Sequence, residues 1–150
     1  MSSSFANENV IDTLCLSEEE RRGIVQELED QEKSGVRMQR RREERPTYFV
    51  CWGLPAKFKP TEADTPYFRV YPRNISQDGI AFIHGNVVSA GTPCTIALKP
   101  FHGQQTLVPG KVVRCFTVGG GTHDIGVNFE HRLDISKFVV IHEEPKGEHT

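Results

Sequence analysis

The residues best suited to chemistry are five arginines between positions 37 and 45. Arg41 and Arg45 stand four residues apart, Arg37 stands four before Arg41, and Arg40 and Arg42 flank Arg41. A planar guanidinium forms paired hydrogen bonds with a phosphate or with one edge of guanine, and it stacks on flat bases. The segment is therefore either a clamp for an anionic, guanine-bearing ligand or a solvated linker. Taken alone it favours the linker, because runs of charge are usually solvated.

A second polar stretch runs from Asn74 through Ser76 to Gly79. Asparagine tolerates left-handed backbone and hydrogen-bonds its own chain in turns, and glycine permits a positive φ or the close approach of another group. One interpretation is a turn between two strands. The other is a binding wall in which the Asn74 amide and the Ser76 hydroxyl face a polar ligand.

No arrangement in the sequence indicates catalysis or a metal site. The cysteines have no C-x-x-C spacing, the histidines have no metal-binding spacing, and no nucleophile-elbow pattern is present. The triplet Gly119-Gly120-Gly121 lacks the Gly-Lys-Ser/Thr of a phosphate loop, so a hairpin is favoured. We therefore predict a protein with no catalytic residue, no metal and no cofactor.

Composition limits the class of protein. The chain has 150 residues, 37% of them hydrophobic, which suits one domain with extensions. The net charge of −2 disfavours a general nucleic-acid binder, which is normally basic. We find no apolar run long enough for a membrane span and no secretory signal, so a cytoplasmic location with reduced thiols is expected.

The N-terminal part is predicted to be an extension over residues 1–36. Residues 1–16 should fray, with at most a short docked turn. Ser17 and Glu20 have the spacing of a capping box, which predicts a helix over residues 18–33. Its apolar stripe is thin, so a solvated lead-in helix is favoured over a partner-binding or regulatory one.

The remaining chain predicts an all-β domain over residues 37–141, followed by a polar tail over 142–150. Short apolar strands separated by Gly/Pro turns favour a six-stranded antiparallel barrel, since closure removes exposed strand edges. Pro109-Gly110 predicts a bulge or bend within a strand. A weak helical pattern over 133–141 predicts a short C-terminal helix. The strands are expected near 47–59, 67–71, 80–84, 94–98, 106–116 and 125–129.

The pair of motifs resembles the signature of the PilZ domain family. Arg41-x-x-x-Arg45 lies just before the first strand, and Asn74-x-Ser76-x-x-Gly79 follows about thirty residues later. The resemblance covers roughly residues 37–140, and the two motifs together, in order, are more specific than either alone. It implies a six-stranded antiparallel β-barrel with a flanking helix, binding of the second messenger cyclic di-GMP, and a bacterial source.

The resemblance also implies roles for single residues. Arg41 and Arg45 would hold guanine and phosphate from a segment that wraps the ligand. Asn74 and Ser76 would hydrogen-bond a guanine or phosphate from the barrel surface, and Gly79 would leave room for it. Many members have Asp at the position of Asn74, and an amide offers both a donor and an acceptor where a carboxylate only accepts.

Two details of the arginine segment stay open. In the family, the residue before the first motif arginine is linked to the number of ligands bound, so Arg40 makes two per site an alternative to one. Arg37-x-x-x-Arg41 also fits the first motif. We favour Arg41 and Arg45, because Pro46 and the first strand follow directly.

These features predict a receptor for cyclic di-GMP whose arginine segment becomes ordered on binding, repositions the N-terminal helix and so signals to a partner protein. The alternative is a PilZ-like protein-interaction module that binds no nucleotide. A third class, disfavoured by net charge, is a single-stranded nucleic-acid binder that uses the arginines with Tyr48, Phe49 and Trp52. We therefore expect no nucleic acid among the partners.

Overall fold

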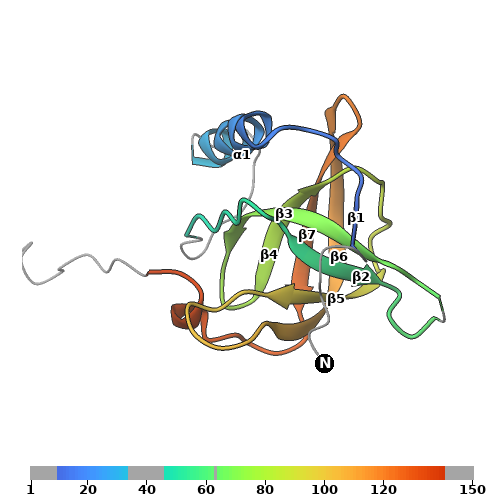
Figure 1. The fold of residues 1–150 in the computed structure, drawn as a ribbon, viewed down its shortest axis with the longest axis vertical. Coiled ribbons are helices and arrows are strands. Elements are labelled where there is room, and N and C mark those ends of the chain that lie inside the picture. The colour runs from blue at the N-terminus through green and yellow to red at the C-terminus, as the bar shows by residue number, and fades with distance from the viewer. Residues whose placement is uncertain (1–9, 34–45, 63, 141–150) are drawn as a thin grey trace, which may run out of the picture.

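The computed structural model describes residues 10–33, 46–62 and 64–140 (Figure 1). Its one α-helix among these residues lies against the outside of a β-barrel, next to β3. The elements in chain order are β1 (Val10–Asp12), α1 (Glu18–Lys33), β2 (Leu54–Phe58), β3 (Tyr67–Ile75), β4 (Gly79–His84), β5 (Pro93–Leu98), β6 (Thr106–Gly119), β7 (Thr122–Phe129) and a 3-10 turn at Ile135–Lys137.

Six strands form the closed antiparallel barrel that the sequence predicts. The order β3-β2-β5-β6-β7-β4 is closed by pairing between β3 and β4. The hairpin of β6 and β7 projects beyond the barrel body (Figure 1). It turns at Gly119, Gly120 and Gly121, all with positive φ, which confirms the predicted glycine hairpin.

A seventh strand, β1, lies where the sequence predicts fraying. It pairs in parallel with β3 over Tyr67–Arg69. On β3, β4 pairs only with residues from Tyr71 to Ile75. β1 therefore satisfies a stretch of strand edge that β4 does not reach, and the prediction of a frayed segment is wrong here.

Two other details of the strands differ from the sequence prediction. The first barrel strand begins only at Leu54, after a turn in which the Gly53 N–H donates to the Val50 carbonyl at 2.8 Å. Pro109 and Gly110 pair in register with β5, and the irregularities of β6 fall after Val112 and after Thr117. The bulge predicted at Pro109-Gly110 is therefore absent from the pairing of β6 with β5.

Helix α1 has the predicted bounds and the predicted capping box. The Ser17 N–H donates to Glu20 Oε1 at 2.9 Å, and the Glu20 N–H donates to Ser17 Oγ at 3.1 Å. The helix is nevertheless docked, because Val25 and Leu28 are buried in an apolar cluster with Leu14, Tyr71 and Ile83. The thin stripe was thus enough for docking, and the prediction of a solvated lead-in helix is wrong.

The predicted C-terminal helix is only a single 3-10 turn over Ile135–Lys137. The Asp134 carboxylate caps it by accepting from the Ser136 N–H at 3.2 Å. Beyond it, Phe138 and Val139 are buried against the barrel core. This packing, together with β-branched Val139 and Val140, works against continuation of a helix.

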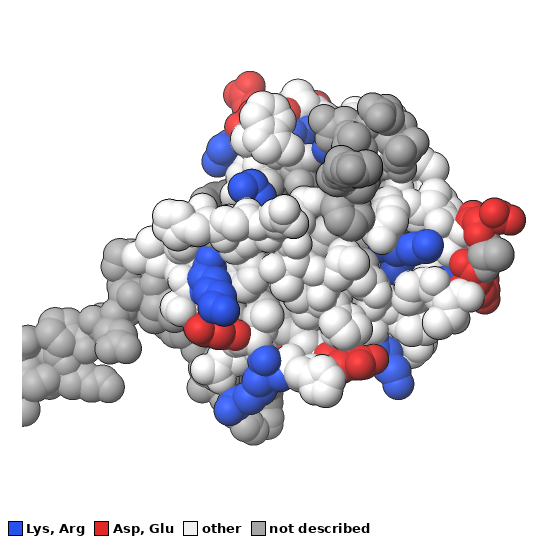
Figure 2. All heavy atoms as spheres, turned by 60° about the horizontal axis from the view of Figure 1, so that its bottom comes forward, with Lys and Arg blue, Asp and Glu red and all other residues white. Residues whose placement is uncertain are grey.

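The barrel encloses the main apolar core, and its outer surface carries both signs of charge. Among the described residues on the face in Figure 2, Lys and Arg side chains are interspersed with Asp and Glu side chains. No helix in the described part of the chain is long and apolar enough to cross a membrane. The largest members of the core include Leu54, Ile75, Ile80, Phe82, Ile96, Leu98 and Ile125.

His84 is a buried titratable group that should make stability depend on pH. It is 0% exposed beside Phe58 and Phe68, and burial, followed by the charge of His123, lowers its pKa from 6.5 to about 4. Between these pH values the unfolded chain binds more protons than the folded chain. The free energy of unfolding should therefore decrease as the pH falls through this window, by roughly 3 kcal/mol in total.

Urea denaturation at pH 7 and pH 4 measures this effect. His84→Gln should show a pH dependence shallower by roughly that amount. His131→Gln, at an exposed position, should follow the wild type. Parallel pH profiles for wild type and His84→Gln would contradict the assignment.

Candidate functional site

The segment that follows the arginines is held directly against the second motif. The Ile75 N–H donates to the Pro46 carbonyl at 3.1 Å, the Tyr48 N–H donates to the Arg73 carbonyl at 3.1 Å, and Thr47 bridges Asn74. The residue that directly follows the first motif, Pro46, is therefore hydrogen-bonded to the second motif. The predicted binding residues Arg40, Arg41 and Arg45, and the alternative Arg37, lie outside the described residues.

Asn74 is the predicted site residue with the most informative surroundings. Its side chain is buried, 0% exposed, rather than open on the barrel surface. The Asn74 Nδ2 amide donates to Glu29 Oε2 of α1 at 2.7 Å. Its Oδ1 is buried without a hydrogen-bond partner among the described residues. In this conformation α1 covers the group that the second motif would offer to a ligand.

Ser76 and Gly79 both have roles within the turn itself. Ser76 is 3% exposed, and its Oγ accepts from the N–H groups of Asp78 and Gly79, each at 3.2 Å. A Cβ on Gly79 would lie 2.3 Å from the Val127 carbonyl oxygen, so the close approach of β7 requires glycine here. Their assignment as ligand-binding residues stays a prediction.

Arg73 forms the centre of a buried ionic cluster beside Asn74. It is 0% exposed and binds Asp124 through Nε and Nη2, each at 2.9 Å. Its Nη2 also donates to Glu32 at 2.8 Å, and its Nη1 donates to Glu29. Burial alone would lower the pKa of Arg73, but the carboxylates of Asp124 and Glu32 raise it above its ordinary value, so the guanidinium stays charged.

A bulge in β3 explains why Arg73 and Asn74 both reach α1. Side chains of consecutive strand residues normally point to opposite faces. The pairing of β3 with β4 shifts between Pro72 and Asn74, leaving Arg73 as the extra residue. Bulges re-aim side chains in this way. Two neighbouring residues of one strand thus bind the same carboxylate, that of Glu29.

The ionic cluster joins α1 to the strands β3, β6 and β7 of the barrel. Among the described residues it contains the carboxylates of Glu29, Glu32 and Asp124 and two guanidiniums, because Arg114 Nη2 lies 3.9 Å from Glu32 Oε2. While the helix stays docked, Glu29 therefore contacts both Asn74 and Arg73, and Glu32 contacts Arg73.

This ionic cluster was not predicted from the sequence. Arg73 directly precedes the second motif, and Glu29 and Glu32 are three residues apart, which places them on one helix face. These signals could have indicated a charged helix face. Nothing local indicates Asp124 as their common partner, because it lies 51 residues from Arg73.

Comparison with known proteins identifies the family. A model described as "PilZ domain" matches residues 39–142, and the chain belongs to this family. Its members are generally receptors or adaptors without enzymatic activity. No curated protein matches the chain.

The chain is also similar to a solved structure, the inhibitor of motility (MotI/DgrA) of Bacillus subtilis. The identity is 22%, the TM-score is 0.45, and the similarity covers 66% of this chain and 46% of that one. The chain thus spans less than half the length of the Bacillus protein.

Proposed function

We propose that this protein is a cytoplasmic, non-enzymatic bacterial receptor for cyclic di-GMP. Arg41 and Arg45 would grip the ligand from one side, and Asn74 and Ser76 from the other. Membership of the PilZ family and the presence of both motifs support the proposal. The observation that carries it is the hydrogen bond from the Ile75 N–H to the Pro46 carbonyl, because it fixes the chain next to Arg45 against the second motif.

The chemistry of the ligand fits the two motifs. Cyclic di-GMP carries two phosphates and two guanines. Each bidentate arginine–guanine pair is worth ~1–3 kcal/mol of discrimination, and a stacked guanidinium adds cation–π attraction. Neighbouring arginines repel one another until phosphates bridge them. Binding should therefore order the arginine segment, with Arg40 as a further phosphate contact.

A ligand that takes the amide donor used by Glu29 must displace this side chain. The Asn74 Nδ2 amide donates to Glu29 Oε2 at 2.7 Å. Displacement of Glu29 costs its hydrogen bonds to Asn74 and Arg73, each worth ~1.5–3 kcal/mol, whereas binding at micromolar affinity supplies about 8 kcal/mol. A ligand of that affinity can therefore replace Glu29. Arg73 would keep its paired hydrogen bonds to Asp124 of the barrel.

Replacement of Glu29 supplies a route for the signal. Helix α1 is held by Glu29 and Glu32, by the apolar contact of Val25 and Leu28, and by Arg21, which donates to the Cys51 carbonyl and lies over the Tyr71 ring. Loss of the Glu29 contacts would weaken this docking and expose that apolar face. A downstream protein partner could then recognise the released helix or the surface beneath it.

The alternative is a PilZ-like interaction module that binds no nucleotide. The Glu29–Asn74 hydrogen bond favours it, since an internal carboxylate already satisfies the amide of the second motif. Titration calorimetry of the folded protein with cyclic di-GMP separates the two functions. Saturable heat at micromolar ligand supports the receptor, and its absence contradicts it and favours the module.

Removing the internal competitor should strengthen ligand binding. Glu29→Ala frees the Asn74 amide and removes one carboxylate from the ionic cluster. Loss of ~1.5 kcal/mol of competition should lower the Kd about tenfold. Glu27→Ala removes the same charge from an exposed position of α1 and is the matched control.

Calorimetric titration of both variants with cyclic di-GMP measures the difference. Equal affinities for Glu29→Ala and Glu27→Ala would show that Glu29 does not compete. Weaker binding by Glu29→Ala would show that the docked helix supports the site instead of covering it.

A further inference from the structure

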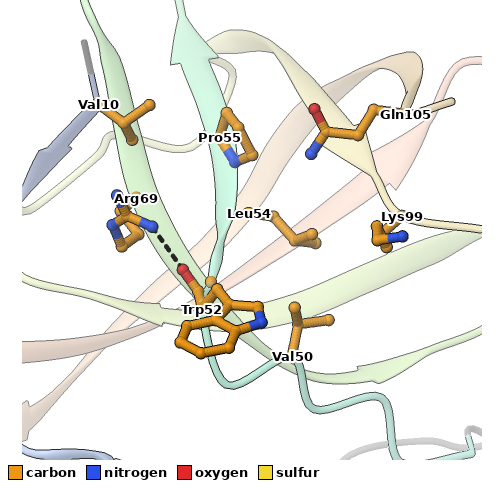
Figure 3. Close-up of a pocket in the computed structure, with 9 residues that line it drawn as sticks. Val10, Val50, Trp52, Leu54, Pro55, Arg69, Lys99 and Gln105 are labelled. Atoms are coloured by element: carbon orange, nitrogen blue, oxygen red, sulfur yellow. Dashed lines mark hydrogen bonds between the residues drawn. The ribbon is translucent and has the colours of Figure 1, made fainter. Parts of the chain in front are cut away.

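A pocket of about 400 Å³ is lined in part by residues of the segment that follows the arginines. Its middle is aliphatic, and Trp52 stands at its edge (Figure 3). It is separate from Asn74, Ser76 and Gly79, none of which lines it. The lining residues are Val10, Val50, Trp52, Gly53, Leu54, Pro55, Arg69, Lys99 and Gln105.

Trp52 is held in an exposed position by its own backbone contacts. The indole-bearing residue is 75% exposed, although tryptophan is usually well buried. Arg69 Nη1 donates to the Trp52 carbonyl at 2.6 Å, and Arg21 Nη2 of α1 donates to the Cys51 carbonyl at 2.9 Å. The turn is thus anchored from two sides. A large apolar side chain presented on a fixed backbone is typical of an interaction hot spot.

The charges around the pocket indicate the kind of segment that it would bind. Arg69 and Lys99 lie on either side of Leu54 in Figure 3. None of the nine described lining residues is Asp or Glu. Tyr48 fixes the backbone of Lys99 by accepting from its N–H at 3.1 Å. Cations beside an aliphatic floor complement an apolar side chain that is flanked by carboxylates.

We propose that this pocket docks an acidic segment of a partner protein, with an apolar side chain inserted between Trp52 and Leu54. Trp and Arg are the residue types most enriched at binding hot spots. Single-stranded nucleic acid fits less well, because its bases stack on aromatic platforms, whereas Val50, Leu54 and Pro55 are aliphatic. The proposal does not depend on nucleotide binding at the other site.

Selection from a random dodecapeptide phage library on the whole protein tests the proposal. The enriched peptides should carry Asp or Glu next to a large apolar residue. A synthetic, labelled copy of the best peptide should bind in an anisotropy titration. Because Trp52 is the sole tryptophan, the same peptide should also shift the intrinsic fluorescence.

Matched variants test whether the selected peptide binds in this pocket. Trp52→Ala should weaken binding of the peptide at least about tenfold, and Lys99→Glu should weaken it about fivefold. Lys111→Glu, which makes the same charge change at an exposed position of β6 outside the pocket, should change affinity less than about twofold. Circular dichroism of each variant verifies folding.

Several outcomes would overturn the proposal. They are failure to enrich any peptide, enrichment without acidic residues, and equal affinities of Lys99→Glu and Lys111→Glu. Stronger fluorescence shifts with a single-stranded oligonucleotide than with the peptide would assign the pocket to nucleic acid instead. None of these results depends on whether cyclic di-GMP binds.

Discussion

Arg73→Met is expected to lower the free energy of unfolding by about 3–5 kcal/mol, because it leaves buried carboxylates without their central cation. Glu29, Glu32 and Asp124 all hydrogen-bond this one guanidinium. A buried pair contributes little net stability when intact, but removing one partner strands a desolvated charge. The urea midpoint measures the loss, and it should decrease with no large change in the slope.

Two other variants make this result interpretable. Arg73→Lys keeps the charge but loses the planar fork, so its loss should be smaller than that of Arg73→Met. Arg22→Ala removes an exposed ion pair with Glu18 and a contact of the guanidinium with the Phe49 ring, and it should cost about 1 kcal/mol. If Arg73→Met were as stable as Arg22→Ala, the buried cluster would not hold α1 to the barrel.

Arg41→Ala and Arg45→Ala are each expected to weaken the binding of cyclic di-GMP at least about a hundredfold. Under the proposed function, each change removes a guanidinium fork that would make two charge-assisted hydrogen bonds with the ligand, and loss of ~3 kcal/mol corresponds to that factor. The described barrel core contains neither residue, so the thermal unfolding midpoint should stay near that of the wild type. Titration calorimetry gives the affinities and differential scanning calorimetry the midpoints.

Arg37→Ala decides the register of the first motif. With Arg41 and Arg45 as the motif pair, Arg37→Ala should retain most of the affinity. Loss of binding in Arg37→Ala with normal binding in Arg45→Ala would assign the pair to Arg37 and Arg41. Normal binding in both Arg41→Ala and Arg45→Ala would contradict a clamp at this segment.

The barrel and the bounds of α1 were predictable because their signals are local. Short apolar strands between glycine and proline turns indicate the barrel, and Ser17 with Glu20 indicates the start of the helix. β1 was missed because a three-residue strand has almost no periodicity. Its partner on β3 begins 57 residues later, at Tyr67 against Val10.

The order of the two motifs could also be recognised in the sequence, but the contact between α1 and Asn74 could not be predicted from it. The contacts of Arg73 with Glu29 and Glu32 join residues 44 and 41 positions apart, and they depend on a bulge that re-aims Arg73. Such pairings follow from the register of β3 against β4. No pattern within α1 encodes that register, so its acidic face resembled an ordinary solvated one.

Because acidic side chains hold α1 to the barrel, the position of this helix can depend on an anionic ligand. Apolar docking alone would respond little to an anionic ligand. Under the proposed function, a phosphate that entered beside Asn74 would act directly on the contacts of Glu29 and Glu32. The ligand-free conformation and the ligand would then compete for the same amide donor, which is the differential interaction that a population shift needs.

Hydrogen–deuterium exchange of the whole protein, with and without saturating cyclic di-GMP, tests the competition between ligand and helix most directly. With ligand, the amides of α1 (Glu18–Lys33) should exchange faster, while those of β3 and β4 should exchange no faster than before. Unchanged or slower exchange in α1, under conditions where calorimetry shows saturation, would show that the ligand does not displace the helix.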